Sequence, residues 1–451
     1  MSRRTGAVLF ALLAVLFLAV NRNAYRGYFQ DDELDTLSWA RYGSAADYLK
    51  AAVSPRFQEN NFRPAGHFYF HESAQLFGLD FPKYVAGIHL LHLLNVWLVW
   101  MLARSLAASP LAAGLGAAFF AFHMALFDAV WKPMYVFDVL CATFCLASLL
   151  LYARQRWVWS FVAFWMAYKS KELAVMLPIV LACYEIWFGK RRWRPLLVFF
   201  AAAFSFGLQG LLFNPNRDNE YTFRFTLTAL AKTSVYYAGR VFLVPYLGFV
   251  LPLAALHRGR RVWFGLAMAG LFFFPLLFLP GRVFAAYCYL PFTGIAIALT
   301  GLAEGVRPVW IGLLVLAWIP LEVHSLRVQE RATLARDRDV REWVTTVEAF
   351  AKSNPAIDGV VADGAPDGFA RWGVEGALKY VFNQYDLKVS YAGDPEAAAM
   401  EKSGKVVLLH WDEGHHRLEV RGANTPVCRV ETLLDAFRGS TRLTGHTKVS
   451  T

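Results

Sequence analysis

The chain has 451 residues, of which 57% are hydrophobic, 16% are aromatic and only 18% are charged. Soluble domains are about 45–50% apolar and about 25% charged, so this composition excludes a set of ordinary soluble domains and indicates a polytopic membrane protein. The formal net charge of +11 is explained by basic loops that orient the chain and meet anionic lipid, so no nucleic-acid partner is expected.

Apolar segments follow one another from the N-terminus to about residue 325. A membrane-spanning helix needs about 20 mostly apolar residues, and fewer where neighbouring helices and aromatic anchors help. By this test the sequence predicts eleven spans, near residues 5–21, 84–106, 110–126, 134–153, 157–169, 172–189, 195–213, 236–256, 263–280, 286–304 and 308–325. The first follows Arg3 and Arg4 like a signal peptide, but the residues after it lack a small-residue cleavage site, so we expect it to be retained.

Basic residues in the short loops predict the orientation of these spans, because cytoplasmic loops carry an excess of Lys and Arg. With the N-terminus in the cytoplasm, the inner side has roughly twice as many basic residues as the outer short loops. After eleven spans, the tail of residues 326–451 then lies outside. We expect the inner membrane of a bacterium as the setting.

Two segments lie outside the predicted spans, both on the outer face. The loop of residues 22–83 is long enough for two interfacial helices, at 34–50 and 65–78. In the tail, apolar runs at 359–362, 387–391 and 405–410 predict strands, while 369–384 and 394–402 predict helices. The predicted fold is therefore an all-α polytopic membrane domain over residues 1–325, followed by a small α/β domain over residues 326–451. The five cysteines, of which Cys428 alone lies outside the apolar runs, predict no disulfide or zinc site.

The outer loop begins with two adjacent acids, Asp31 and Asp32, a few residues beyond the first span. Two carboxylates this close repel each other, which suits one of them to take a proton from a hydroxyl near neutral pH. Alternatively, Asp31 or Asp32 caps the N-terminus of the helix that follows.

The same loop carries the segment Asn61-Phe62-Arg63-Pro64. The planar guanidinium of Arg63 offers a fork that suits a phosphate or a carboxylate. Alternatively, Arg63 is an ordinary solvated arginine before a proline that opens a helix.

A third cluster contains His123, Asp128, Lys132 and Asp138. Asp138 lies about one turn inside the fourth span, where an unpaired acid is costly, so it should have a partner on the outer side. A structural ion pair with Lys132 or Lys171 and a catalytic role explain the presence of Asp138 equally well.

The fourth cluster, Lys169-Ser170-Lys171-Glu172, connects the fifth and sixth spans. Two lysines on the outer side are contrary to the excess of basic residues expected in cytoplasmic loops. A glutamate at the start of a helix interacts favourably with the helix dipole. Alternatively, both lysines are anchors that extend to the interface. All four clusters fall on the outer side under one orientation that other residues determine, which predicts a common site there.

The order of these motifs resembles the GT-C superfamily of membrane glycosyltransferases. Within it, the sequence is most similar to the protein O-mannosyltransferases, in particular to the catalytic part of the transmembrane and tetratricopeptide-repeat O-mannosyltransferases. The segments that carry this resemblance are Asp31-Asp32, Asn61-Phe62-Arg63-Pro64, Phe77-Gly78-Leu79, the helix with His92 and Asn95, the set His123, Asp128 and Asp138, Ser170-Lys171-Glu172 with Pro178, and Tyr287-Cys288-Tyr289-Leu290-Pro291. The resemblance covers roughly residues 20–300, so it implies nothing about the tail.

This resemblance implies an enzyme that moves a sugar from a polyprenyl-phosphate donor to an acceptor hydroxyl at the outer face, with inversion at the anomeric carbon. Asp32, or failing that Asp31, would be the catalytic base. Lys171, Arg63 and Lys169 would bind the donor phosphate. Supporting positions are Glu172, His123, Asp128, Asp138, Lys132, Tyr287 and Tyr289.

No metal or other cofactor is expected, because no metal-ligand spacing is present and this branch of the superfamily is thought to work without one. The expected partners are the lipid bilayer, the lipid-linked sugar and an acceptor that the sequence does not identify. Two alternatives remain open: a transporter or flippase for a lipid-linked or anionic solute, and a scaffold whose outer tail binds partners.

Overall fold

The computed structural model describes residues 3–56, 62–213, 219–401 and 405–422. Asn61, Cys428 and the last residue of the predicted helix 394–402 lie outside these ranges. The chain divides into two compact units. The first, here called the membrane unit, comprises Met1–Arg26 and Gly43–Arg331; the second, the tail unit, comprises Gly27–Tyr42 and Ala332–Thr451.

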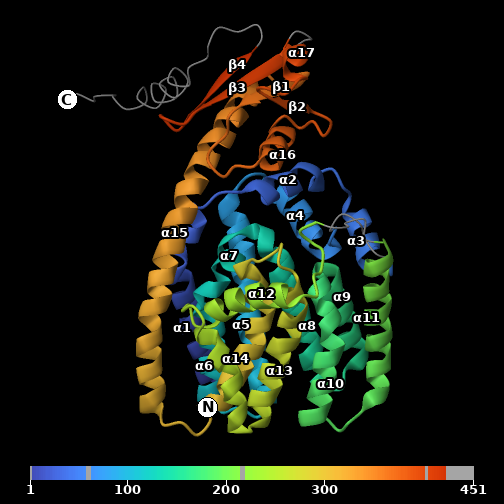
Figure 1. Cartoon of the computed structure of the whole chain (residues 1–451), viewed down its shortest axis with the longest axis vertical. Helices are drawn as coiled ribbons and strands as arrows, with labels where there is room; N and C mark the ends of the chain where they lie inside the picture. Colours follow the sequence, from blue (N-terminus) through green and yellow to red (C-terminus); the bar gives the residue numbers. More distant parts are fainter. Residues whose placement is uncertain (1–2, 57–61, 214–218, 402–404, 423–451) are drawn as a thin grey trace, which may run out of the picture. The chain divides into compact units, whose positions relative to one another are not determined.

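In its described residues, the membrane unit consists of helices joined by loops (Figure 1). Its α-helices are α1 (Arg3–Val20), α3 (Ala45–Val53), α4 (Pro64–Phe77), α5 (Phe81–Ser105), α6 (Pro110–Phe122), α7 (Phe127–Trp131), α8 (Val136–Ala153), α9 (Trp157–Ser170), α10 (Leu177–Trp187), α11 (Trp193–Phe213), α12 (Leu227–Val241), α13 (Arg260–Phe273), α14 (Tyr289–Ala303) and the first part of α15 (Pro308–Ser353). Short 3₁₀ segments lie between them: η1 (Arg22–Arg26), η2 (Met124–Leu126), η3 (Pro133–Tyr135), η4 (Glu172–Met176), η5 (Leu247–His257), η6 (Phe274–Phe278) and η7 (Ala285–Cys288).

Within the described residues, five helical segments are long and apolar enough to cross a membrane. They are Phe81–Ser105, Pro133–Ala153, Arg260–Phe278, Ala285–Ala303 and the apolar part of Pro308–Ser353. Pro110–Phe122 and Met124–Trp131 make a sixth if this pair, bent by 43°, counts as one span. The multi-pass membrane class is confirmed, but the count of eleven is not, because several apolar runs form helices too short to span alone. For example, α9 has 14 residues and α10 has 11.

The continuous helix expected over residues 236–256 is broken. Helix α12 ends at Val241, and Leu243 and Tyr246 adopt φ angles of +57° and +63°. This left-handed backbone is unfavourable for residues with a side chain and is incompatible with a right-handed helix. Pro245 between them also lacks the N–H that a helix needs.

The core of the membrane unit lies among α5, α6, α8, α13 and α14, of which α14 contacts each of the other four (Figure 1). Small residues allow the closest of these contacts. A Cβ atom on Gly265 of α13 would lie 2.3 Å from the backbone nitrogen of Ala298, and one on Gly294 of α14 would lie 2.4 Å from that of Ala269. Glycines at such crossings let two backbones approach, as is common between helices in membranes.

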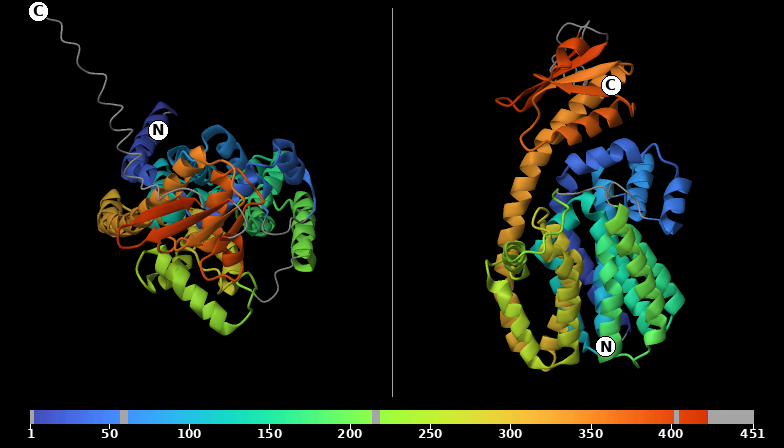
Figure 2. Two further views of the ribbon diagram at one scale, coloured as in Figure 1. Left: turned by 90° about the horizontal axis from the view of Figure 1, so that it is seen from above. Right: turned by 45° about the vertical axis from the view of Figure 1, so that its right-hand side comes forward.

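The tail unit is a small α/β structure, as predicted. It contains α2 (Asp31–Ala40), the end of α15, β1 (Gly359–Asp363), α16 (Arg371–Val381), β2 (Lys388–Tyr391), α17 (Ala397–Glu401), β3 (Val406–Asp412) and β4 (Arg417–Gly422). The strand order is β2-β1-β3-β4, with β1 parallel to β2 and β3 and with β4 antiparallel to β3 (Figure 2). Strand β4 was not predicted. The location of this unit on the outer face stays a prediction.

The division predicted between residues 325 and 326 falls inside α15, which continues as one helix of 46 residues from Pro308 to Ser353. Lys, Arg and Glu are good helix formers, so a charged stretch ends the apolar run without ending the helix.

The helix predicted at 34–50 is two helices. Helix α2 ends at Ala40, and the side chain of Ser44 accepts a hydrogen bond from the Asp47 N–H to cap the start of α3. Helix α2 packs on α16 in the tail unit, where Gly376 allows close contact: a Cβ atom there would lie 2.5 Å from the Cα of Asp35.

Candidate functional site

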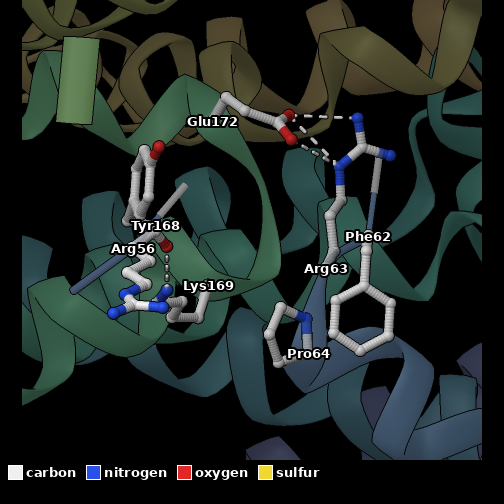
Figure 3. A pocket seen from close by; sticks show the side chains of 7 residues that line it. All are labelled: Arg56, Phe62, Arg63, Pro64, Tyr168, Lys169 and Glu172. Atoms are coloured by element: carbon white, nitrogen blue, oxygen red, sulfur yellow. Dashed lines mark hydrogen bonds and ion pairs between the residues drawn. The ribbon is translucent and has the colours of Figure 1, made fainter. Parts of the chain in front are cut away.

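Arg63 and Glu172, which are 109 positions apart in sequence, form a two-pronged ion pair in the membrane unit (Figure 3). The Arg63 Nε donates to Glu172 Oε1 at 2.9 Å and to Oε2 at 3.1 Å, and Nη2 donates to Oε2 at 3.0 Å. Pro64 is the first residue of α4, so Arg63 is held at the helix start, where a proline is well tolerated. The guanidinium fork predicted from the sequence therefore binds a carboxylate of the chain itself.

The surroundings of Arg63 fix its side chain and its charge. Its guanidinium carbon lies 5.5 Å from the ring centre of Phe137, and its backbone N–H donates to His67 Nδ1 at 2.9 Å. Burial alone would lower the pKa of Arg63, but the facing Glu172 carboxylate raises this pKa above its ordinary value. Burial, and then the charge of Arg63, lowers the pKa of His67 to about 3, so the His67 ring is neutral at physiological pH.

A second ion pair joins Lys171 and Asp138, with Nζ 2.5 Å from Oδ1. Both side chains are largely buried, and the Lys171 ammonium lies 4.0 Å from the ring centre of Tyr287. The expectation that Asp138 has a cationic partner is confirmed, and of the two lysines considered, the partner is Lys171. Asp138 lies in the first turn of α8, where the helix dipole also favours its negative charge.

A pocket with an empty volume of about 290 Å³ opens beside the Arg63–Glu172 pair (Figure 3). It is lined by Arg56, Phe62, Arg63, Pro64, Tyr168, Lys169 and Glu172. The buried Lys169 ammonium donates to the backbone oxygen of Arg56 at 3.3 Å and lies 5.9 Å from the ring centres of Trp165 and Phe206. The lining thus holds three cationic side chains and one carboxylate, which suits an anionic ligand.

Arg56 is the pocket residue that the sequence did not single out. It lies between α3 and α4, outside every recognised motif. A basic residue just ahead of Asn61-Phe62-Arg63-Pro64 was the available signal, but an isolated arginine in a loop is ordinarily solvated.

Three of the predicted supporting residues lie in other surroundings. His123 is buried, with Nε2 2.9 Å from the backbone oxygen of Val241 and Nδ1 accepting from the Ala125 N–H at 3.1 Å. The other two, Asp128 and Lys132, form an ion pair of 2.8 Å with each other. Each of these contacts satisfies polar groups within the helical framework.

Tyr287 and Tyr289 differ although they are two residues apart. The Tyr287 ring contacts the Lys171 ammonium, whereas the Tyr289 hydroxyl is buried 2.8 Å from His92 Nδ1 and 3.1 Å from Asn95 Nδ2. The Asn95 amide also donates to the backbone oxygen of Val139 at 3.0 Å. Tyr289 therefore belongs to a buried polar network that joins α5, α8 and α14.

The two candidate acids belong to the tail unit. Asp31 Oδ2 lies 2.6 Å from Arg336 Nη2, and Asp31 Oδ1 accepts from the Ala370 N–H at 2.8 Å. Asp32 is exposed and accepts from Trp372 Nε1 at 2.9 Å. The alternative that Asp31 or Asp32 caps α2 is not what the structure shows, since the capping residue is Gln30 and Glu33 completes the capping box.

In the part of the chain that the structure describes, no group of three or more His, Cys, Asp or Glu side chains could hold a metal ion. Cys141, Cys145, Cys183 and Cys288 are free thiols. Independence from metal stays a prediction.

No family model and no curated protein matches the chain. Several solved structures do match the chain. The crystal structure of ArnT from Cupriavidus metallidurans in the apo state is 13% identical, with a TM-score of 0.51 over 94% of this chain and 98% of that chain. The structure of the same protein bound to undecaprenyl phosphate is 14% identical, with a TM-score of 0.52 over the same shares.

The mycobacterial arabinofuranosyltransferase AftD, solved by cryo-electron microscopy, is 16% identical and has a TM-score of 0.45, over 87% of this chain and 32% of that chain. The similarity to O-mannosyltransferases in particular stays a prediction. This chain therefore shares the fold of ArnT along almost its whole length, in agreement with the GT-C-like fold that the order of motifs predicts.

Proposed function

We propose that the protein is a glycosyltransferase that takes a sugar from a polyprenyl-phosphate donor and passes it to an acceptor hydroxyl. The acceptor belongs to a protein, a lipid or a glycan. The reaction takes place at the outer face of a bacterial cell membrane, with the N-terminus in the cytoplasm. The fold supports this proposal, because a structure with the same fold is bound to undecaprenyl phosphate.

The observation that carries the proposal is the excess of positive charge around the pocket. Arg56, Arg63 and Lys169 line it together with Glu172, and the Lys171–Asp138 pair lies within electrostatic range of the same groups. Four cations and two carboxylates leave a formal excess of two positive charges. This excess of positive charge would stabilise the negative charge of a departing phosphate.

The charge of the phosphate increases during the proposed reaction. A sugar-linked phosphodiester carries one negative charge, while a free phosphate monoester carries about −1.5 to −2 at pH 7. Fixed cations therefore bind the leaving group more strongly than they bind the donor. Stronger binding of the transition state than of the ground state is what accelerates the step.

Arg63 and Lys171 are the proposed phosphate ligands, with Lys169 beside them. In the described structure each of the first two is held by a carboxylate, Glu172 or Asp138. The carboxylates keep the cations in place before the donor arrives. Because Glu172 is half exposed, its pair with Arg63 is the one that an entering phosphate can most readily share.

Asp32 is the proposed base. It removes the proton from the acceptor hydroxyl while the oxygen forms a bond to the anomeric carbon from the side opposite the phosphate. The bond between that carbon and the phosphate oxygen breaks with its electron pair, so the lipid phosphate leaves as an anion. This sequence inverts the anomeric centre and needs no acid for the leaving group.

The test uses the purified full-length protein in lipid nanodiscs with radiolabelled polyprenyl-phosphate hexoses and pentoses, added one at a time. The wild type should release or transfer sugar from at least one donor, and Arg63→Gln should reduce the rate about 10²- to 10³-fold, as for loss of one charge-stabilising donor. Lys83→Gln, which removes an exposed cation paired with Asp80, is the matched control and should retain the rate. Movement of intact donor across liposomes without cleavage would instead support the flippase alternative.

A further inference from the structure

The adjacent acids at the start of α2 are held by different kinds of partner within the tail unit. Both Asp31 oxygens are engaged, one by the Arg336 guanidinium and one by the N–H of Ala370. Ala370 is the residue directly before α16, so Asp31 also faces the positive end of that helix. The Asp31 carboxylate is therefore enclosed, with a cation on one oxygen and a helix N-terminus on the other.

Arg336 is itself held in place by three acceptors. Besides Asp31, it donates through Nη1 to the Gln30 side-chain oxygen at 3.3 Å and through Nη2 to the backbone oxygen of Gly368 at 2.5 Å. Gly368 has a φ of +72°, a backbone conformation that glycine adopts at little cost. The guanidinium therefore has a fixed position between α2 and the segment that leads into α16.

Asp32 has a different environment. Its Oδ1 accepts a hydrogen bond from the neutral indole N–H of Trp372, and the rest of the exposed carboxylate is open to solvent. Trp372 is 54% exposed, so its ring covers Asp32 only in part. Consecutive residues of a helix point in different directions, which lets one of the two acids be enclosed while the other stays accessible.

We propose that Arg336 and Trp372 are positioning residues, each for one of the two adjacent acids. Arg336 holds Asp31 as an ionised clamp between α2 and α16, and Trp372 orients the Asp32 carboxylate so that its second oxygen receives the acceptor proton. This inference rests on the proposed function, and it assigns the tail unit a part in the chemistry.

The contact between α2 and α16 supports this division. A Cβ atom on Gly373 would lie 2.6 Å from the Cα of Asp31 and 2.8 Å from its Oδ1, so only glycine fits beside the clamp. Gly373 follows Trp372 directly. The same close approach therefore places the indole on Asp32 and the helix start on Asp31.

Other charged groups near this end of α2 have their own partners. Glu33 accepts from the Gln30 N–H, and Asp337 accepts from the Tyr28 N–H at 2.9 Å and from the Gln30 amide at 3.0 Å. Asp35 lies within electrostatic range of Asp32 and of Lys379 and Glu375 on α16. None of the substitutions below changes these groups.

The first test is the pH dependence of transfer in two variants. Trp372→Phe keeps an aromatic ring but removes the N–H donor, and Arg336→Gln leaves the charge of Asp31 beside Asp32 without its cationic partner. Each change removes a group that stabilises negative charge on one of the two adjacent acids. We expect the acidic limb of the kcat profile to move about one unit to higher pH, so that kcat falls by up to about tenfold at pH values on that limb, with the KM for the donor unchanged.

Two further variants separate positioning from folding. Arg336→Lys retains the charge and should restore a profile close to that of the wild type. Arg336→Gln combined with Asp31→Asn removes both charges and should return the acidic limb to its original place. Loss of activity with an unmoved acidic limb in both Trp372→Phe and Arg336→Gln would overturn the inference, as would a larger loss in Asp31→Asn than in Asp32→Asn.

A second measurement does not depend on transferase activity. Carboxyl groups of the folded protein are coupled to an amine with a water-soluble carbodiimide, and the modified peptides are quantified by mass spectrometry. Asp32 should be modified several-fold faster than Asp31 in the wild type, and Arg336→Gln should make Asp31 reactive. Equal modification of the two acids in the wild type would overturn the inference that Arg336 holds Asp31. If the wild type shows faster modification of Asp32 than of Asp31 but no transferase turnover, the result counts against the proposed function alone.

Discussion

The membrane unit and the tail unit hold their charged residues in different ways. In the membrane unit, Arg63 and Lys171 each face a carboxylate from a distant part of the sequence, and the Lys171–Asp138 pair is largely buried. In the tail unit, Asp31 is enclosed but Asp32 remains exposed with one neutral donor. Under the proposed function, this difference fits two tasks: fixed cations that stabilise the charge of the phosphate, and an accessible carboxylate that takes a proton.

The largest effect should come from the exposed acid. Asp32→Asn cannot accept a proton, so transfer should fall about 10²- to 10⁴-fold, the usual contribution of a general base. The rate is measured with the donor that supports wild-type turnover, and expression and the thermal unfolding midpoint should be unchanged because Asp32 is exposed. Wild-type turnover in Asp32→Asn would remove this residue from the mechanism.

The buried pair allows stability and activity to be separated. Lys171→Met leaves the Asp138 carboxylate buried without its cation, which should cost about 3–5 kcal/mol of unfolding free energy. Activity should fall about 10²- to 10³-fold.

Combining Lys171→Met with Asp138→Leu replaces the pair by apolar side chains and should recover most of that stability, since such replacements are often neutral. Activity should remain lost, because the cation is still missing. Thermal unfolding and transfer are measured on the same preparations. Recovery of activity together with stability would show that Lys171 is only structural.

A smaller effect is expected where charge is kept but geometry changes. Arg63→Lys retains the cation and loses the planar fork that now holds Glu172 through both Nε and Nη2. Loss of one hydrogen bond to a charged group is worth about 1.5–3 kcal/mol, so the KM for the donor should rise about 10- to 100-fold. The initial rate as a function of donor concentration gives this value, and an unchanged KM would exclude Arg63 as a donor ligand.

The smallest effect concerns stability alone. The pKa of His67 is about 3 in the folded protein and 6.5 in its ordinary state, so the unfolded chain binds more protons between these values. The contribution of His67 is therefore fully present above pH 6.5 and is lost as the pH falls, by about 1.4 kcal/mol at pH 5.5. His67→Asn, which keeps an acceptor for the Arg63 N–H, should flatten this dependence in thermal unfolding between pH 7.5 and 5.5. An equally steep dependence in the variant would contradict this assignment.

Much of the fold follows from local sequence patterns. The apolar runs near 84–106 and 134–153 became α5 and α8 within a few residues, because hydrophobic length and composition are local properties. The break after Val241 could not be predicted from the local sequence, because Leu243 and Tyr246 are not residues that usually take a left-handed backbone. Strand β4 was missed because its alternating charged residues at Arg417, Glu419 and Arg421 resemble a solvated loop.

The site was predictable in its residue types but not in its pairings. The cost of an isolated acid in a span predicted a partner for Asp138, and the two motif cations were recognised. Which carboxylate meets which cation depends on how α4, α8 and η4 pack, and this is not a local property. The contacts of Arg56, Arg336 and Trp372 were missed for the same reason, since each acquires its neighbours only through tertiary structure.

Binding of the lipid phosphate tests the central claim most directly. Polyprenyl phosphate is titrated into the purified full-length protein, and bound lipid is followed by native mass spectrometry and by the phosphorus NMR shift. The wild type and Lys83→Gln should bind with equal affinity, and Arg63→Gln should bind at least about tenfold more weakly because a charged ligand contact is lost. Equal affinity of the wild type and Arg63→Gln would contradict a phosphate site at this pocket.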